Sequence, residues 1–273
     1  MENKVLIKTD CELIIGDQDF IEADLQAGHQ LTLTIRTQPG SSGVAVINIC
    51  QAAKLTINTE VSRDSRLTVL YWNTAANLDV TEQVTLQEHA VYKVAYGELE
   101  TGILNRKADI ELAGRCAQAE LVSAALVSAK KHMDLTCHHQ AKDTIANMQT
   151  YGVIQTGGEY YVKATGHIVK HASGSKSHQT SRALTFADQQ RVDIIPLLLI
   201  DENDVEASHA MSIGQLDENQ LYYLESRGLT KNDALRLIAL GYLLPIAKVI
   251  DNEQLKSYLE EIINKKVQET CLM

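Results

Sequence analysis

Histidine and cysteine side chains offer the most chemistry in this chain, because imidazole and thiolate groups are ligands of transition metals. The stretch TCHHQ places Cys137 and His139 on the same face of an extended strand, with His138 on the opposite face. Two readings are therefore open for Cys137 and His139. They could supply two ligands of a metal site, or they could be side chains of the hydrophobic core. A further histidine, His209, stands at the end of the last extended segment, next to where a helical pattern begins.

The remaining thiols and imidazoles do not suggest a ligand cluster. The sequence has five cysteines and no C-x-x-C pair: Cys11, Cys50, Cys116, Cys137 and Cys271. Scattered thiols without a secretion signal are typical of a reducing compartment, and we expect each to be a small buried hydrophobe. His167, His171 and His178 lie in a polar, turn-rich stretch, where we expect exposed side chains.

Motifs of nucleotide binding and of covalent catalysis are missing from the sequence. The segment ASGSKSH lacks the glycine that a phosphate-binding loop places before its lysine, here Lys176, and we interpret it as a polar turn. No G-x-S-x-G, H-E-x-x-H or G-x-G-x-x-G occurs. The sequence therefore predicts a protein that is not an enzyme by itself.

The charge balance argues against nucleic acid as a partner. The 273 residues include 35 acidic and 25 basic ones, for a net charge of -10, and no Lys/Arg-rich run stands out. The N-terminus MENKVLIKTD has no apolar segment of a signal peptide. The longest apolar stretch, LRLIALGYLLPIAKVI, is interrupted by Arg236, Pro245 and Lys248, which does not suit a membrane span. We expect a cytoplasmic protein without membrane contact.

Strands must position most of these residues. From residue 1 to 212, apolar and polar residues alternate, as in QLTLTIRT and KLTINTE, which is typical of strands with one buried face. A β-sandwich and a β-helix of stacked coils both fit this pattern. The Asn-Gly and Asp-Gly pairs of tight hairpins are absent, and only 5% of residues are aromatic, so Val, Ile, Leu and Ala must build the core. Both observations favour the β-helix.

The periodicity changes from strand to helix near residue 214. DENQLYYLESRG begins with acidic residues and stops at Gly228, and Thr230 with Asp233 forms the N-terminal cap of a second helix. A third helix is indicated by NEQLKSYLEEIINKKV, whose apolar residues share one face. The predicted domains of this mainly β protein are a β-helix core over residues 1–212 and a C-terminal helical domain over residues 213–273.

The segment from Ser177 to Leu243 resembles the core of the SufB/SufD family of iron–sulfur cluster assembly scaffolds. The elements that match the family pattern, in order and separation, are Pro196 to Ile200, Asp204-Val205, Ser208-His209, Gly214 and LYYLESRG from Leu221 to Gly228. The resemblance implies a right-handed parallel β-helix followed by a small helical domain.

The resemblance also implies partners. In this family SufB and SufD pair through their β-helices, and each docks a SufC-type ATPase on its C-terminal helices. His209 corresponds to a SufD-type histidine at the pairing interface, where a metal could bridge two chains. Iron or an iron–sulfur cluster is therefore implied at that interface, with none held stably by this chain alone.

Residues of the first helix are candidates for the ATPase-docking surface, because aromatic and Arg side chains are favoured at interfaces. The candidates are Tyr222, Tyr223, Leu224, Arg227 and Gly228. In an alternative reading, Tyr222 and Leu224 only pack this helix onto the end of the β-helix, and Arg227 caps local carbonyl groups.

Several positions depart from the family pattern. Gln190 stands where SufB-type chains carry a cysteine, so the chain is SufD-like. Ala207 and Ala210 stand beside His209 where a cysteine and a glycine often occur, and the chain resembles a short form without the family's N-terminal helical region. Two other functions stay open: a homodimeric structural relative of SufD without a cluster role, and a β-helical enzyme.

Overall fold

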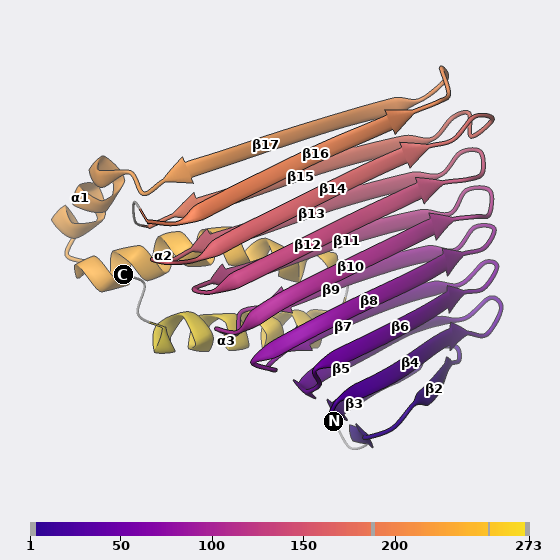
Figure 1. Ribbon diagram of the computed structural model, residues 1–273, viewed down its shortest axis with the longest axis horizontal. Coiled ribbons are helices and arrows are strands. Elements are labelled where there is room, and N and C mark those ends of the chain that lie inside the picture. Colours follow the sequence, from indigo (N-terminus) through magenta and orange to yellow (C-terminus); the bar gives the residue numbers. More distant parts are fainter. Residues whose placement is uncertain (1–3, 187–188, 251, 271–273) are drawn as a thin grey trace.

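The computed structural model describes residues 4–186, 189–250 and 252–270, and its strands form two parallel sheets. Within these ranges, the nine strands of the first sheet are β1 (Lys4–Ile7), β3 (Phe20–Gln26), β5 (Ser42–Gln51), β7 (Arg66–Asn73), β9 (Val91–Glu98), β11 (Gln118–Val127), β13 (Ile145–Ile154), β15 (Lys176–Thr185) and β17 (Glu206–Gln215). The eight of the second sheet are β2 (Cys11–Ile15), β4 (Gln30–Thr37), β6 (Lys54–Val61), β8 (Asn77–Leu86), β10 (Ile103–Leu112), β12 (Lys130–His139), β14 (Glu159–Ile168) and β16 (Arg191–Ile200). Because the chain changes sheet at every strand, each coil adds one strand to each sheet, and the predicted parallel β-helix is confirmed (Figure 1).

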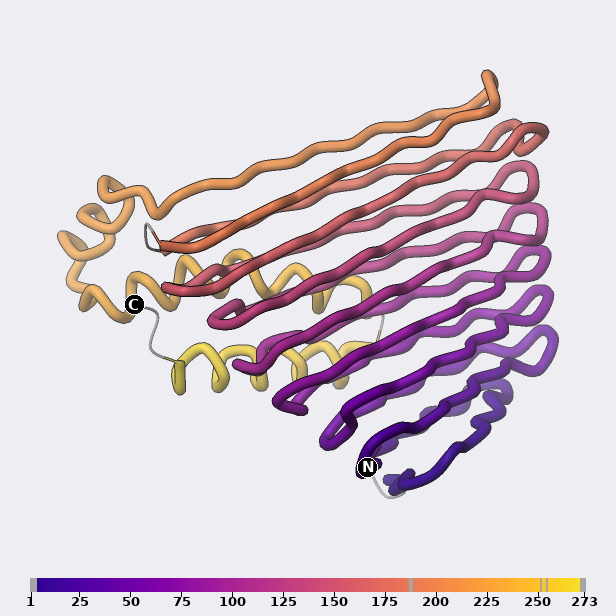
Figure 2. Tube along the Cα trace, viewed as in Figure 1, coloured from indigo at the N-terminus to yellow at the C-terminus, as the bar shows by residue number. Residues whose placement is uncertain are grey.

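Successive coils stack in register, and they become longer along the chain. Phe20 of β3 pairs with Val44 of β5, whereas Ile145 of β13 pairs with Lys176 of β15. The solenoid therefore widens from its N-terminal end toward β17 (Figure 2).

The turns that follow the even strands explain the missing hairpin signals. Each of several turns contains one non-glycine residue with positive φ: Gln18, Asp64, His89, Cys116 and Asp143. These turns are hydrogen-bonded to the next coil, as where Asp64 N donates to Glu88 O at 3.0 Å. A tight type I′ hairpin needs two successive residues with positive φ, and hence Asn-Gly, whereas these turns need only one.

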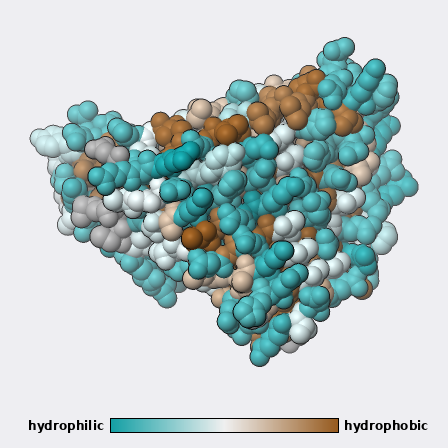
Figure 3. All heavy atoms as spheres, in the orientation of Figure 1, coloured by the Kyte–Doolittle hydropathy of each residue, from teal (hydrophilic) through white to brown (hydrophobic). Residues whose placement is uncertain are grey.

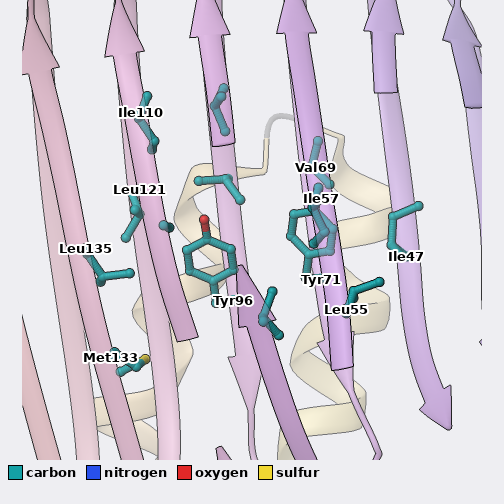
Figure 4. Close-up of a cluster of buried hydrophobic side chains, with 14 of the residues drawn as sticks. Ile47, Leu55, Ile57, Val69, Tyr71, Tyr96, Ile110, Leu121, Met133 and Leu135 are labelled. Atoms are coloured by element: carbon teal, nitrogen blue, oxygen red, sulfur yellow. The ribbon is translucent and has the colours of Figure 1, made fainter. Parts of the chain in front are cut away.

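The interior between the two sheets is mainly aliphatic, as expected. Figure 4 shows part of it, with side chains that include Ile47, Leu55, Val69, Ile110 and Leu135. Each such buried side chain stabilises the fold by roughly 1.5–3 kcal/mol. Tyrosines add to it, and the rings of Tyr71 and Tyr96 stack with centroids 5.8 Å apart.

A buried ion cluster interrupts this interior. The guanidinium of Arg106 lies between two carboxylates, with Nη2 2.8 Å from Glu98 Oε1 and Nη1 3.4 Å from Glu82 Oε2. Tyr92 and Tyr96 donate hydrogen bonds to the two oxygens of Glu82, at 3.0 and 2.8 Å. Burial raises the pKa of Glu82, and the charge of Arg106 with the two tyrosine hydroxyls opposes that rise. A buried charge of either sign thus finds its partners within the cluster.

Helix α1 (Glu218–Ser226) follows β17. Helix α2 (Lys231–Leu243), the 3-10 helix η1 (Leu244–Val249) and helix α3 (Glu253–Glu269) form a second layer on the outer face of the odd-strand sheet (Figure 1). Leu243 and Leu259 are fully buried against strand residues such as Leu70 and Val122. No helix in the described ranges is long and apolar enough to cross a membrane.

The helix ends agree with the predicted capping residues. Thr230 Oγ1 accepts a hydrogen bond from Asp233 N at 3.2 Å, and Gly228 after α1 has a φ of 95°. Strand β17 ends at Gln215, so the change from strand to helix falls slightly after residue 212.

Candidate functional site at the open end of the solenoid

The C-terminal end of the solenoid is open. Among the described strands, β17 pairs with β15 alone and β16 pairs with β14 alone. Every residue of β17 is exposed except Gly214, which is half-buried. The outer edges of β16 and β17 therefore present unpaired backbone N–H and C=O groups, a template for another chain.

Large apolar side chains accompany this edge. They are Ile195, Leu199 and Ile200 of β16 and Met211 and Ile213 of β17. Figure 3 shows hydrophobic atoms gathered along the upper edge of the molecule, where Figure 1 places these two strands. An exposed apolar patch on an unpaired edge is typical of a protein–protein contact.

His209 lies on the open edge, but not where the sequence pattern suggested. It is exposed in the first half of β17, beside Gln179 of the coil beneath. The prediction that it stands at the end of the strand, next to the helices, is wrong, because β17 continues to Gln215. At 3.3 Å per residue, about 20 Å of strand separates His209 from the start of the helices.

The interior layer beneath His209 is polar. Ser177 and Gln179 are buried, and Ser177 Oγ and Gln179 Oε1 have no hydrogen-bond partner in the described part of the chain. The Gln179 side chain donates from Nε2 to Leu197 O at 2.8 Å. Unsatisfied buried polar atoms are costly, so this layer favours a water or a partner chain that reaches under β17.

Cys137 and His139 are both buried inside the solenoid, on β12, which is paired on both sides. Burial raises the pKa of the Cys137 thiol to about 12 and lowers the pKa of His139 to about 4. His139 Nδ1 lies 2.8 Å from Thr144 Oγ1. The structure thus places both side chains in the core, where burial disfavours the thiolate that a metal ion would bind.

The other cysteines and histidines depart in part from their expected burial. Only Cys137 is buried; Cys11, Cys50 and Cys116 are half-buried, and Cys271 lies outside the described residues. His171 is exposed as expected, whereas His167 and His178 are half-buried on β14 and β15. The polar turn was placed correctly up to Ser175, but Lys176 and His178 already belong to β15.

Helix α1 projects from the body, and none of its described residues is buried. Tyr222 is 73% exposed and Tyr223 55% exposed. The guanidinium of Arg227 lies 5.1 Å from the centre of the Tyr223 ring. Tyr222 therefore does not pack α1 onto the end of the β-helix, whereas Leu224 is half-buried.

A groove runs between α1 and α2. Its apolar walls include Tyr223 and Leu224 from α1 and Leu237, Ile238 and Tyr242 from α2. An apolar groove flanked by exposed tyrosines and an arginine is a suitable surface for a protein partner.

The residues that depart from the family pattern lie at the same open end. Gln190 is half-buried just before β16, and Ala207 and Ala210 are exposed on β17 beside His209. Within the described ranges, no group of three or more His, Cys, Asp and Glu side chains converges as metal ligands.

Comparison with known proteins identifies the family of this chain. Residues 21–242 match the family model described as SUF system FeS cluster assembly, SufBD core domain. The chain belongs to the SufBD core family. It is 38% identical over 130 residues to the iron–sulfur cluster assembly protein SufD of Bacillus subtilis, an alignment that covers 48% of this chain and 30% of that SufD.

Other relatives show whether this chain is more similar to SufB or to SufD. The chain is 25% identical to SufB of Bacillus subtilis over 189 residues, which cover 68% of this chain and 40% of that SufB. It is 30% identical to a SufBD family protein of Mycobacterium tuberculosis, covering 68% of this chain and 22% of that protein. The higher identity to SufD makes this SufBD core chain SufD-like, and it spans less than half the length of these relatives.

Proposed function

We propose that this SufD-like chain is a non-catalytic subunit of a cytoplasmic iron–sulfur cluster assembly scaffold, and that it pairs with a SufB-like chain. One observation carries the proposal: in a SufBD core domain, β16 and β17 present an unpaired edge with exposed Leu199, Met211 and Ile213. A partner strand on this edge would satisfy its backbone groups and cover the apolar patch at the same time.

His209 is the ligand that this chain would offer to the iron cargo. Its imidazole is exposed on the edge that the partner would cover. Iron–sulfur clusters need several thiolate or imidazole ligands, and Ala207 and Gln190 supply neither. The partner would therefore contribute the other ligands, and this chain would not hold a cluster stably by itself.

The groove between α1 and α2 is the proposed docking surface for a SufC-like ATPase. Exposed Tyr222 and Tyr223, with Arg227 against the Tyr223 ring, provide aromatic and cationic anchors. Leu224 contributes to the apolar wall, and Gly228 ends α1 with a positive φ that orients the chain toward α2. This surface lies on the helices and not on β17, so both partners could bind together.

A homodimeric relative of SufD without a cluster role is the second candidate. The same open edge would serve two copies of this chain, and the missing thiols at Gln190 and Ala207 favour it. A β-helical enzyme finds less support, since the buried carboxylates of Glu82 and Glu98 are paired with Arg106 inside the solenoid.

The test is anaerobic co-expression of this chain with SufB-like and SufC-like proteins of the same source, followed by affinity capture and iron and sulfide assays. Ile213→Asp should abolish capture of the SufB-like chain, because it places a charge in the interface. Leu6→Asp, at the exposed opposite end of the solenoid, is the matched control. His209→Ala should retain the partner and lose iron.

Three other results would contradict parts of the proposal. If Ile213→Asp and Leu6→Asp reduced capture of the SufB-like chain equally, the edge formed by β16 and β17 would not be the interface. Unchanged iron with His209→Ala would leave the chain as an architectural subunit. A homodimer that captures neither partner would favour the second candidate.

Tyr222→Ala with Tyr223→Ala should release only the SufC-like ATPase.

A further inference from the structure

Two histidines from neighbouring coils meet on the outer face of the even-strand sheet. His138 of β12 is the register partner of His167 of β14. Their Nδ1 atoms are 3.3 Å apart, and the rings meet edge to face with an interplanar angle of 72°. This pair lies on the opposite sheet from His209 and faces outward, and His167 is the register partner of Leu199 on the edge strand β16.

A carboxylate faces the other nitrogen of each ring. Asp109 Oδ1 lies 3.9 Å from His138 Nε2, and Asp201 Oδ2 lies 3.4 Å from His167 Nε2. A carboxylate on one side of an imidazole favours the tautomer with the proton on that side. With this tautomer in both rings, the two Nδ1 lone pairs face each other, and a proton or a metal ion held between them would remove their repulsion.

The spacing fits a metal ion as that cation. Zinc–imidazole bonds are about 2.0–2.1 Å long, so two nitrogens of a tetrahedral zinc site lie roughly 3.3 Å apart. Asp201 beside His167 also matches the arrangement found around metal-bound histidines, in which a carboxylate accepts the second ring N–H, whereas Asp109 lies 3.9 Å from His138, beyond hydrogen-bond distance.

The pair is accessible to an ion from solution. The side chains of His138 and His167 are 30% and 28% exposed. Because no group of three or more metal-ligating side chains converges in the described residues, water must fill the other coordination positions. We propose that His138 and His167 form a two-ligand surface site for a borderline divalent transition-metal ion, with Zn²⁺ as the reference ion.

The site is tested on the full chain by calorimetric titration with ZnCl₂ at pH 7.5. His138→Gln and His167→Gln should each weaken the tightest site at least tenfold, because each removes one of two ligands. His132→Gln is the matched control: this histidine lies on the same face of β12 but packs against Tyr161, with ring centroids 4.2 Å apart. It should leave the affinity unchanged.

Ring ¹⁵N chemical shifts distinguish the metal from a shared proton. With Zn²⁺ present, the Nδ1 signals of both His138 and His167 should move to the range of coordinated nitrogens. Zn²⁺ affinity that is unchanged in both pair variants would overturn the proposal. So would a chain that binds no Zn²⁺ and whose two Nδ1 atoms share one proton at all Zn²⁺ concentrations.

Discussion

At the scale of single residues, burial decides the protonation of the groups inside the solenoid. His139 has only Thr144 Oγ1 beside its Nδ1 atom, and its Nε2 atom finds no hydrogen-bond partner in the described residues. Desolvation lowers its pKa to about 4, with smaller contributions from His138 and His167. The neutral imidazole is therefore the form that the folded chain accepts.

This lowered pKa predicts a pH dependence of stability. Below the ordinary histidine pKa of about 6.5, the unfolded chain binds a proton that the folded chain takes up only near pH 4. The contribution of neutral His139 to the free energy of unfolding is therefore present in full above pH 6.5. It is lost progressively as the pH falls from 6.5 toward 4. Between pH 7 and pH 5, the wild type should lose roughly 2 kcal/mol more than His139→Asn in urea unfolding.

Exposed His171, which also has a positive φ that Asn tolerates, supplies the control. His171→Asn should keep the pH dependence of the wild type. The same slope in His139→Asn and the wild type would contradict the assignment of the effect to His139.

Arg106 is the second residue whose burial has a measurable consequence. Arg106→Ala leaves the carboxylates of Glu82 and Glu98 in the core without a counter-charge, and should lower the free energy of unfolding by about 3–5 kcal/mol. The neighbouring Lys107 side chain is 60% exposed, so Lys107→Ala should change little. Urea unfolding followed by circular dichroism compares the two, and similar losses would show that the cluster is not stabilising.

At the scale of elements, the helical layer is held by buried leucines and by an ion pair between α3 and the solenoid. Lys266 Nζ of α3 lies 2.6 Å from Glu100 Oε2, just after β9. Both side chains are about one-quarter exposed, so the ion pair adds little. The apolar contacts between the helices α2 and α3 and the odd-strand sheet contribute most of the free energy that holds the helices on the sheet.

The same Leu→Ala substitution at two positions of α2, one buried and one exposed, distinguishes the effect of packing from that of helix propensity. Leu243 is fully buried against the odd-strand sheet, and Leu243→Ala should cost about 2–5 kcal/mol of unfolding free energy. Leu237 is 51% exposed, and the same substitution there should have a small effect on stability. Thermal and urea unfolding measure both, and equal effects would mean that α2 is not docked as described.

At the scale of the whole molecule, the solenoid is a stack in which each coil contacts its neighbours. Central strands are paired on both sides, whereas β17 and β16 are paired on one side within the described residues. In such stacks, terminal repeats are the first to open, because they lack one neighbour interface.

Amide hydrogen exchange should therefore follow position in the stack. β11 and β12 should exchange slowest and β17 fastest among the long strands. Addition of a SufB-like partner should slow exchange in β17 and β16 and leave β2 unchanged. Protection that appears at β2 instead would assign the interface to the opposite end of the solenoid.

Part of the site was predictable because it depends on local pattern. The order Ser208-His209, Gly214 and LYYLESRG identified the family, and the family model confirms it over residues 21–242. The position of His209 within its strand was missed, since alternation continues past residue 212 and no turn residue marks the true end at Gln215.

The meeting of His138 with His167 was not predictable from the sequence. It depends on the length of one coil, and coil lengths vary along the chain. A change of one residue in the turn would place His138 opposite a different side chain and invert which face the next strand buries.

The sequence by itself determined the strands, their buried faces, the helix caps and the family, because alternation and capping act between residues close in the chain. Only the tertiary structure decided which side chains meet across coils: the Glu82–Arg106–Glu98 cluster, the His138–His167 pair and the open edge around His209. Glu82 with Arg106 and His138 with His167 are about one coil apart, and Glu98 faces Arg106 from the opposite sheet. Their geometry follows from stacking and register, which no local pattern specifies.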